Sequence, residues 1–354
     1  MKKPTKLKGR GALSNRAGRF AKTESERVYD DLEDEELVDS VPTELHADAS
    51  RSIVARNRSP DIPFDQSINP YRGCEHGCIY CYARATHSYL DLSPGRDFET
   101  QIYYKPRAVE LLRKELARPG YQVSPIALGT NTDPYQPAER RLELTRGILE
   151  LLHETRHPVS IVTKSGLVLR DLDVLERLAQ DGLVAVFVSV TTLDKDLKRR
   201  LEPRTAGPER RLQAIRELSR HGVPTGVMAA PVIPALNDHE LERILEASAD
   251  AGARSAGYVL LRLPHEVRPL FVEWLNEHFP DRAEHVLSLV RQMRDGRLND
   301  PRFHSRQRGA GPYAELLKAR FERARRACGL TGSIELDTAL FRRPRPATGQ
   351  LELL

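Results

Sequence analysis

The chain has 354 residues, of which 40% are hydrophobic and 30% are charged, and its formal net charge is +5. This composition predicts a folded core and excludes a disordered chain, and the net charge is mildly basic without the strong excess of a dedicated nucleic-acid binder. The longest uninterrupted apolar run, Leu183 to Val188, is too short to cross a bilayer, and no apolar segment follows the basic start. We therefore expect a cytoplasmic protein with no membrane partner.

The first predicted region is an N-terminal extension over residues 1–57. Its first 22 residues contain eight Lys or Arg and no acidic residue, and an acidic stretch follows from Glu24 to Asp39. Apolar periodicity is absent until about Ile53, so we expect this extension to be partly disordered or draped on the body. Its basic part is either a solubilising tail or an arm that contacts a polyanion.

From Gln66 onward, short apolar runs alternate with amphipathic helical patterns, as in parallel strands that are buried on both faces. The predicted strands are 66–70, 125–129, 159–163, 184–190, 225–229 and 256–261. The predicted helices between them are 107–117, 139–153, 172–180, 208–221 and 238–251. Units of this β-then-α type predict an α/β fold, which is either a right-handed parallel barrel or an open doubly wound sheet.

Two observations favour the barrel. No Gly-x-Gly-x-x-Gly pattern follows the first predicted strand, so the signature of a dinucleotide-binding sheet is missing. Polar residues also lie at the carboxyl ends of nearly all predicted strands, and in barrels this edge carries the chemistry. These residues are Arg72, Thr130, Asp133, Lys164, Ser189 and Thr191. We therefore predict a barrel core over residues 58–279.

The last region, residues 280–354, is predicted to be basic and helical. Between Asp281 and Arg326 there are twelve Lys or Arg against six Asp or Glu. A glycine-rich basic loop over residues 302–313 leads into a predicted helix from Ala314 to Ala327. This region is either a solvated helix that closes the barrel or a surface that holds a phosphate-rich substrate.

Three of the four cysteines, Cys74, Cys78 and Cys81, lie within eight residues in the pattern Cys-x3-Cys-x2-Cys. Thiolates this close on a glycine-containing loop can bind one soft metal centre. A [4Fe–4S] cluster normally takes four cysteines, so three leave one iron open to the amine and carboxylate of S-adenosylmethionine (SAM). A structural zinc with His76 as fourth ligand, or cysteines that bind no metal, are the alternatives.

This cysteine motif, with an aromatic residue before its last cysteine and a first strand ahead of it, resembles the radical SAM superfamily. The resemblance spans roughly residues 60–330 and implies a partial (β/α)6 TIM-type barrel, flanked by the N-terminal extension and the basic C-terminal region. Finer features resemble the spore-photoproduct-lyase-like branch, also labelled DNA-repair-photolyase-like. These are Tyr80-Cys81-Tyr82, Thr130-Asn-Thr-Asp133-Pro-Tyr-Gln-Pro-x-Glu139, Val162-Thr-Lys164-Ser, Val188-Ser189-Val190, Glu202-Pro-Arg204 and Ala230-Pro-Val-Ile-Pro234-Ala-Leu-Asn-Asp238.

The resemblance implies that Cys74, Cys78 and Cys81 bind three irons of a [4Fe–4S] cluster and that SAM occupies the fourth. Reduction of SAM would then give a 5′-deoxyadenosyl radical that abstracts hydrogen from a substrate, with nucleic acid as a candidate. It also implies an electron donor such as a flavodoxin or ferredoxin. The alternative is a nucleic-acid-binding protein whose cluster is structural.

Roles for other residues follow from their chemical type and their place in the resemblance. The candidate catalytic residues are Tyr82, Thr130 and Asp133. The candidate SAM-binding residues are Tyr80 and Ile233 at the adenine, Ser189 at the ribose or methionine group, Thr132, and Lys164 at the carboxylate, with Glu202 and Arg204 as an ion pair nearby. Ordinary packing, capping or surface roles are the alternatives for all of these residues.

One departure from the branch concerns the hydrogen donor. The lyase itself carries a cysteine just after its second strand, where this sequence has Thr130. A hydroxyl is a far poorer hydrogen-atom donor than a thiol, so the resemblance does not extend to thymine-dimer repair by the same route. The remaining thiol, Cys328, lies in the basic C-terminal region.

Overall fold

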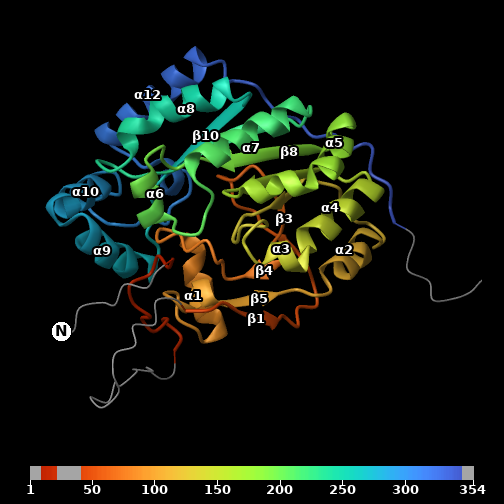
Figure 1. The fold of residues 1–354 in the computed structure, drawn as a ribbon, viewed down its shortest axis with the longest axis horizontal. Helices are drawn as coiled ribbons and strands as arrows, with labels where there is room; N and C mark the ends of the chain where they lie inside the picture. The colour runs from red at the N-terminus through yellow and green to blue at the C-terminus, as the bar shows by residue number, and fades with distance from the viewer. Residues whose placement is uncertain (1–8, 22–40, 345–354) are drawn as a thin grey trace, which may run out of the picture.

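The computed structural model describes residues 9–21 and 41–344. Its core is a seven-stranded sheet in the order β10-β9-β8-β7-β6-β3-β2 (Figure 1). Six strands run parallel, and β2 (Val54–Arg56) pairs antiparallel with β3 (Gln66–Ile68) at one edge. The other strands are β6 (Ile126–Leu128), β7 (Val159–Thr163), β8 (Val184–Ser189), β9 (Thr225–Val232) and β10 (Ser255–Leu260).

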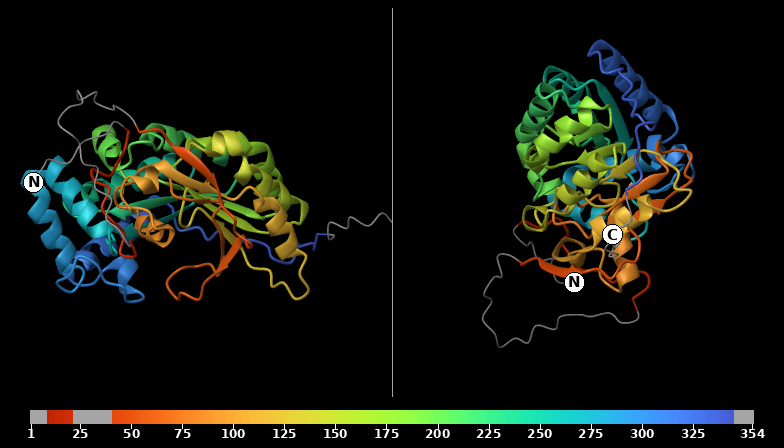
Figure 2. Two further views of the ribbon diagram at one scale, coloured as in Figure 1. Left: turned by 90° about the horizontal axis from the view of Figure 1, so that it is seen from below. Right: turned by 90° about the vertical axis from the view of Figure 1, so that its right-hand side faces the viewer.

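Helices follow these strands and cover one side of the curved sheet (Figures 1 and 2). They are α2 (Ala108–Leu116), α3 (Glu139–Leu142), α4 (Leu144–Glu154), η2 (Gly166–Asp171), α5 (Leu172–Gln180), α6 (Lys195–Leu201), α7 (Pro208–Arg220), η3 (Asp238–Glu240) and α8 (Leu241–Asp250). Within the described ranges β10 and β2 do not pair with each other, so the barrel is partial. The predicted α/β class and its six β/α units are confirmed.

The predicted boundaries differ from the observed ones by up to three residues, and two of the differences have a clear local cause or location. The predicted helix 139–153 is two helices, because Glu143 has a left-handed backbone with φ of 48°. Buried Glu139 accepts a bond from the Thr145 amide at 3.0 Å, which fixes the chain at this break. Strand β9 also continues to Val232, three residues beyond the prediction, through Pro231, where a strand is normally expected to weaken.

A second, three-stranded sheet lies beside the barrel in the order β1-β5-β4. Its strands are β1 (Glu44–Ala47), β4 (Tyr71–Arg72) and β5 (Gln101–Tyr104), and the short helices η1 (Tyr82–Leu90) and α1 (Asp97–Thr100) adjoin it. Strands β1 and β2 and residues 9–21 fall in the predicted N-terminal extension, and Ala12 and Leu13 are buried. The rest of that extension, residues 1–8 and 22–40, lies outside the described residues.

The C-terminal region is helical, with α9 (Val267–His278), α10 (Pro280–Gln292), α11 (Ser305–Arg308) and α12 (Pro312–Ala327). Helix α12 corresponds to the predicted helix 314–327 and packs on α8, where Arg320 pairs with Glu242 at 2.7 Å. Around Trp274, α9 and α10 form a second apolar core that reaches the cysteine loop. No helix in the described parts of the chain is both long and apolar enough to span a membrane.

Candidate active site

The cysteine loop follows β4 and lies beside the carboxyl ends of the parallel strands. Cys74 and Cys78 are buried, Cys81 is partly buried, and all three are free thiols. Gly73 and Gly77 have φ angles of 79° and 67°, a left-handed backbone that favours glycine, so they let the chain turn sharply between the cysteines. Three thiols therefore lie on one tightly folded loop.

Backbone and side-chain bonds hold this loop from several sides. The Cys74 amide donates to the Phe98 carbonyl at 2.8 Å, and the Ile79 amide donates to the Leu201 carbonyl at 3.0 Å. Arg84 Nε donates to the Cys78 carbonyl at 2.8 Å. Arg84 is fully buried and pairs with the equally buried Glu99. These bonds hold the loop without using the cysteine thiols.

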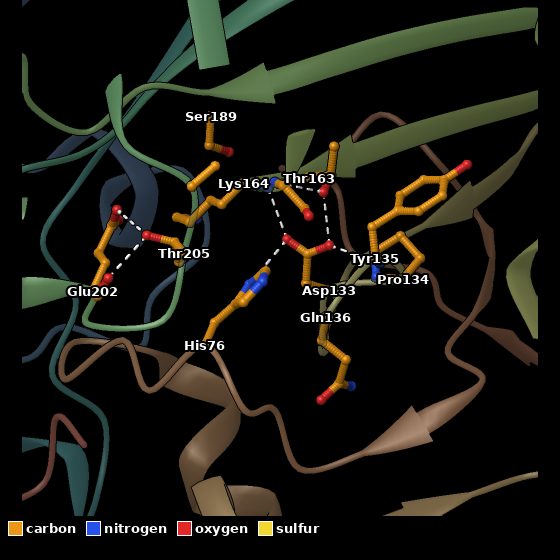
Figure 3. Close-up of polar contacts among 12 residues, drawn as sticks. His76, Asp133, Pro134, Tyr135, Gln136, Thr163, Lys164, Ser189, Glu202 and Thr205 are labelled. Carbon is orange, nitrogen blue, oxygen red and sulfur yellow. Dashed lines mark hydrogen bonds and ion pairs between the residues drawn. The ribbon is translucent and has the colours of Figure 1, made fainter. Parts of the chain in front are cut away.

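The side chains fit an iron–sulfur cluster better than a single metal ion. In a cubane each thiolate binds a different iron, whereas a zinc ion needs its donors to converge on one point. Among the described residues no group of three or more His, Cys, Asp or Glu converges in that way. His76, the proposed fourth zinc ligand, instead faces Asp133, with 3.3 Å between Nδ1 and Oδ2 (Figure 3). The zinc alternative is therefore not supported.

Burial raises the pKa of all three thiols, and it raises that of Cys78 to about 12. Thiols in this state are poor ligands until a cation lowers their pKa, because only the thiolate binds metal. Lys164 acts in this direction, because its positive charge lowers the pKa of both Cys78 and Cys81. Binding of a metal cluster would release the thiol protons and offset the cost of burying the thiolates.

A buried polar network lies behind the loop and centres on Glu202. Its carboxylate accepts from Tyr80 Oη and from Thr191 Oγ1, the latter at 2.6 Å, and it pairs with Arg211. Burial alone would raise the pKa of Glu202, but Arg211, Lys164 and these hydroxyls lower it to about 2. Glu202 is therefore an anion fixed within the protein.

The expected ion pair between Glu202 and Arg204 is wrong. Arg204 pairs instead with Glu75, with 3.1 Å between Nη2 and Oε1, and Glu202 takes Arg211 from α7 as its partner. A fully buried carboxylate without a counter-charge is costly, and Arg211, which is 1% exposed, lies beside Glu202, whereas the Arg204 side chain is 34% exposed and reaches Glu75. Glu202 and Arg204 are close in the sequence, but this spacing did not indicate that each pairs with another residue.

Lys164 ends strand β7 and extends toward the same network. Its Nζ lies 5.9 Å from the centre of the Tyr80 ring, and its charge lowers the pKa of Glu202. Across the described chain no carboxylate lies within ion-pair distance of this ammonium. Lys164 therefore offers an available positive charge beside the cysteine loop.

Asp133 holds the strand ends and the loop together. It accepts from Thr163 Oγ1 and from the Lys164 amide, each at 2.7 Å, and from the Tyr135 amide at 2.9 Å (Figure 3). Burial would raise the pKa of Asp133, but the His76 ring and these donors lower it to about 2. Asp133 thus joins the end of β7 at Lys164 to His76 of the cysteine loop.

The other predicted site residues lie around this centre. Ser189 is buried close to Lys164, and buried Ile233 shares an apolar cluster with Tyr80. Thr132 Oγ1 donates to the Tyr71 carbonyl at 3.1 Å, so its hydroxyl supports strand β4. Thr130 Oγ1 accepts from Asn69 Nδ2 at 3.1 Å, and its carbonyl accepts from the hydroxyl of Tyr82.

Three arginines that the sequence did not single out also shape the site. Arg84 and Arg211 are buried under the loop, and Arg262 follows β10 with its Cζ 5.7 Å from the centre of the Tyr82 ring. Burial and the nearby charge of Arg306 lower the pKa of Arg262. Arginine is common in this sequence, so only a prediction of side-chain burial could have separated these three arginines from those on the surface.

Comparison with protein families gives one match over the barrel. Residues 68–247 match the family model described as the radical SAM superfamily. The protein Rv2578c of Mycobacterium tuberculosis is 41% identical over 243 residues, which is 67% of this chain and 72% of that protein. A protein named radical SAM Nalpha-GlyT isomerase, from Pseudomonas phage M6, is 22% identical over 81% of this chain and 56% of its own length.

Solved structures share the fold at low identity. A spore photoproduct lyase variant matches with a TM-score of 0.58 and 15% identity, over 83% of this chain and 82% of that chain. The lyase complexed with dinucleoside spore photoproduct also matches with a TM-score of 0.58, at 16% identity, over 80% and 79% of the two chains. Another lyase structure, with a TM-score of 0.50, is matched over 66% of its length.

Proposed function

Because the chain belongs to the radical SAM superfamily and is an enzyme that uses a [4Fe–4S] cluster and SAM, we propose that Cys74, Cys78 and Cys81 bind the cluster. The three thiols on one tightly bonded loop are the single observation that carries this proposal. When bound, the reduced cluster supplies the electron that cleaves SAM to methionine and a 5′-deoxyadenosyl radical. Family membership favours this catalytic role over a structural cluster in a nucleic-acid-binding protein.

The residues behind the loop would bind SAM. Lys164 offers its ammonium to the SAM carboxylate, since it has a free positive charge and Asp133 fixes its backbone. Ser189, buried close to Lys164, would bond a hydroxyl or amine of SAM. Tyr80 and Ile233 would form the apolar wall against the adenine, and the fixed anion Glu202 would attract the positively charged end of SAM.

Two residues at the mouth of the barrel would face the substrate. Tyr82 directly follows the last cysteine, is 44% exposed, and bonds the Thr130 carbonyl. Its phenol is the group that we propose for hydrogen transfer to or from the substrate, and Thr130 would line the same face. Asp133 accepts from Thr163 and Thr132 donates to the Tyr71 carbonyl, so we propose positioning roles for both residues.

The mouth of the barrel favours an anionic substrate. Arg262 stacks on Tyr82, and Arg308 lies with its Cζ 4.1 Å from the centre of the Tyr258 ring, both close to the end of β10. The Tyr82 ring is exposed whereas the Tyr258 ring is buried, so Arg262 beside Tyr82 is the guanidinium placed to bind a phosphate or a stacked base. The lyase structure holds a dinucleoside photoproduct, so we propose a nucleic acid as the substrate class and a flavodoxin or ferredoxin as the electron donor.

A calorimetric titration with SAM tests the binding residues. The anaerobically reconstituted wild type should bind SAM, and Lys164→Met should bind it about 10- to 100-fold more weakly, because a charged hydrogen bond is lost. Lys114 is an exposed residue of α2, so Lys114→Met is the matched control and should bind SAM with the affinity of the wild type. Equal affinity of the Lys164→Met and wild-type proteins would refute the assignment of the carboxylate to Lys164.

A second experiment tests the substrate class. With perdeuterated single-stranded oligonucleotides as the probe, reduced enzyme and SAM should give 5′-deoxyadenosine that carries deuterium. Arg262→Gln should weaken oligonucleotide binding and reduce the salt dependence of that binding. Uncoupled SAM cleavage with no deuterium transfer from DNA or RNA would reject a nucleic-acid substrate but leave the SAM chemistry intact.

A further inference from the structure

A short N-terminal segment, residues 10–13, lies directly on the outer side of the cysteine loop. We name this segment the strap. Arg10, Ala12 and Leu13 are at most 8% exposed, although they come from a region with the composition of a solvated tail. Beyond the strap, Ser14 Oγ donates to Glu273 of α9 at 2.6 Å, and Asn15 bonds Asp97 of α1 at 2.9 Å. The strap is thus tied at its end to two helices that flank the loop.

The strap contacts the loop mainly through one buried carboxylate, that of Glu99. The amides of Gly11 and Ala12 each donate to Glu99 at 2.9 Å, and Arg10 Nη1 donates to the Glu99 carbonyl at 2.7 Å. Glu99 in turn pairs with Arg84, whose Nε donates to the carbonyl of Cys78. A continuous chain of bonds therefore runs from the strap to a cysteine of the loop.

The same two segments also contribute to one apolar core. Ala12 and Leu13 belong to one buried cluster with Cys78, Ile79 and Tyr80. Side chains buried against a metal site control its access to solvent and the polarity around it. The strap therefore covers the side of the loop that would otherwise meet water.

Gly11 shows how closely the two backbones approach. A Cβ added to Gly11 would lie 1.9 Å from the Gly77 carbonyl oxygen and 3.4 Å from Glu99 Oε1. Gly77 itself lies between Cys74 and Cys78 in the sequence. Only a residue without a side chain fits between the strap and the loop, so even one methyl group must displace one of them.

We infer that the strap is a fixed wall of the cluster site, which positions Cys78 through Glu99 and Arg84 and shields the cluster from solvent. This inference rests on the proposed cysteine ligands. It also gives Arg10 and Arg19 roles other than binding a polyanion, because Arg10 bonds Glu99 and Arg19 pairs with Glu266 at 2.8 Å. The strap residues contact neither substrate nor SAM in this proposal and are positioning residues.

The test is the rate at which the reconstituted full-length protein loses iron to an excess of a ferrous chelator, followed by its visible absorbance. Gly11→Ala should release iron roughly 10-fold faster than wild type, since residues around a metal site typically change its affinity by about 10- to 100-fold. Gly207→Ala is the matched control, because a Cβ at Gly207 meets no atom within 4 Å. It should release iron at the wild-type rate.

Leu13→Ala removes part of the buried apolar side chain of the strap without introducing a clash, and it should also release iron faster than the wild type. If Gly11→Ala fails to fold, the result for Leu13→Ala tests the inference. The thermal unfolding of each apoprotein is compared, so that loss of iron is separated from loss of fold. Wild-type release rates in both folded strap variants would overturn the inference. Failure of the wild type to take up iron at all would instead refute the proposed ligands.

Discussion

At the scale of single residues, the three cysteines of the loop differ from Cys328, which lies at the end of α12. We predict that Cys74→Ala, Cys78→Ala and Cys81→Ala each abolish the visible absorbance of the reconstituted cluster, because only three thiol ligands are available in the loop. Cys328→Ala should keep full iron and sulfide content. A cluster of normal content in any of the three loop variants would contradict the ligand assignment.

Glu202 gives a second prediction at this scale. Glu202→Gln should lower the free energy of unfolding of the apoprotein by about 3–5 kcal/mol, since it leaves Arg211 buried without a counter-charge. Glu209→Gln, in an exposed pair with Lys195, should change it by less than about 1 kcal/mol. Urea unfolding at pH 7 measures both, and similar losses in the two variants would show that burial does not decide the effect.

The Glu202 carboxylate also makes the stability of the protein depend on pH. The pKa of Glu202 falls from 4.5 to about 2 on folding, so its contribution is fully present above pH 4.5 and is lost as the pH falls toward 2. A shift of this size corresponds to about 3 kcal/mol. The difference in stability between the wild type and Glu202→Gln should therefore shrink between pH 4.5 and pH 2. A difference independent of pH in this window would contradict the buried-anion assignment.

At the scale of elements, the two edges of the open sheet are joined by side chains. Arg306 in α11 donates through Nε to Asp61, in the connection between β2 and β3, at 2.7 Å, and the His304 amide donates to the same carboxylate at 3.3 Å. These bonds hold the pKa of Asp61 well below its usual range. The basic loop thereby bridges the gap that the strands leave open.

Arg306→Gln should release this bridge. We expect a loss of about 1–3 kcal/mol, between the values for exposed and buried pairs, and faster hydrogen exchange in residues 57–65 and 302–308. Arg291→Gln, in an exposed pair with Glu284, is the control and should leave exchange at both segments unchanged. Unchanged exchange in Arg306→Gln would show that other contacts close the sheet.

Elements with strong periodicity could be predicted from the sequence, and irregular ones could not. The apolar runs predicted the parallel strands, and the β/α alternation predicted the barrel. Helix α1, with Phe98 and Glu99, was missed because four residues carry no periodic signal, yet it bonds the loop at Cys74 and, through Arg84, at Cys78. The sequence predicted that the N-terminal extension is partly disordered or draped on the body, but its basic composition could not show that residues 10–13 are a buried part of it.

At the scale of the whole molecule, the site is assembled from parts distant in sequence. The cysteine loop, the end of β7 at Lys164 and the Glu202–Arg211 pair supply the proposed cofactor site, and the strap covers it from outside. The cysteines and Lys164 could be predicted to converge, because strand ends of a parallel barrel meet at one edge. The partner of Glu202 could not be predicted from the sequence, since it depends on how α7 packs and therefore on the burial of Arg211.

The most direct test of the central claim is the reductive cleavage of SAM by the reconstituted protein under anaerobic conditions. With dithionite as reductant, the wild type should form 5′-deoxyadenosine and methionine in equal amounts, and Cys78→Ala should form neither. Mass spectrometry and amino-acid analysis measure both products. An intact wild-type cluster that binds SAM but yields no 5′-deoxyadenosine on reduction would contradict the account.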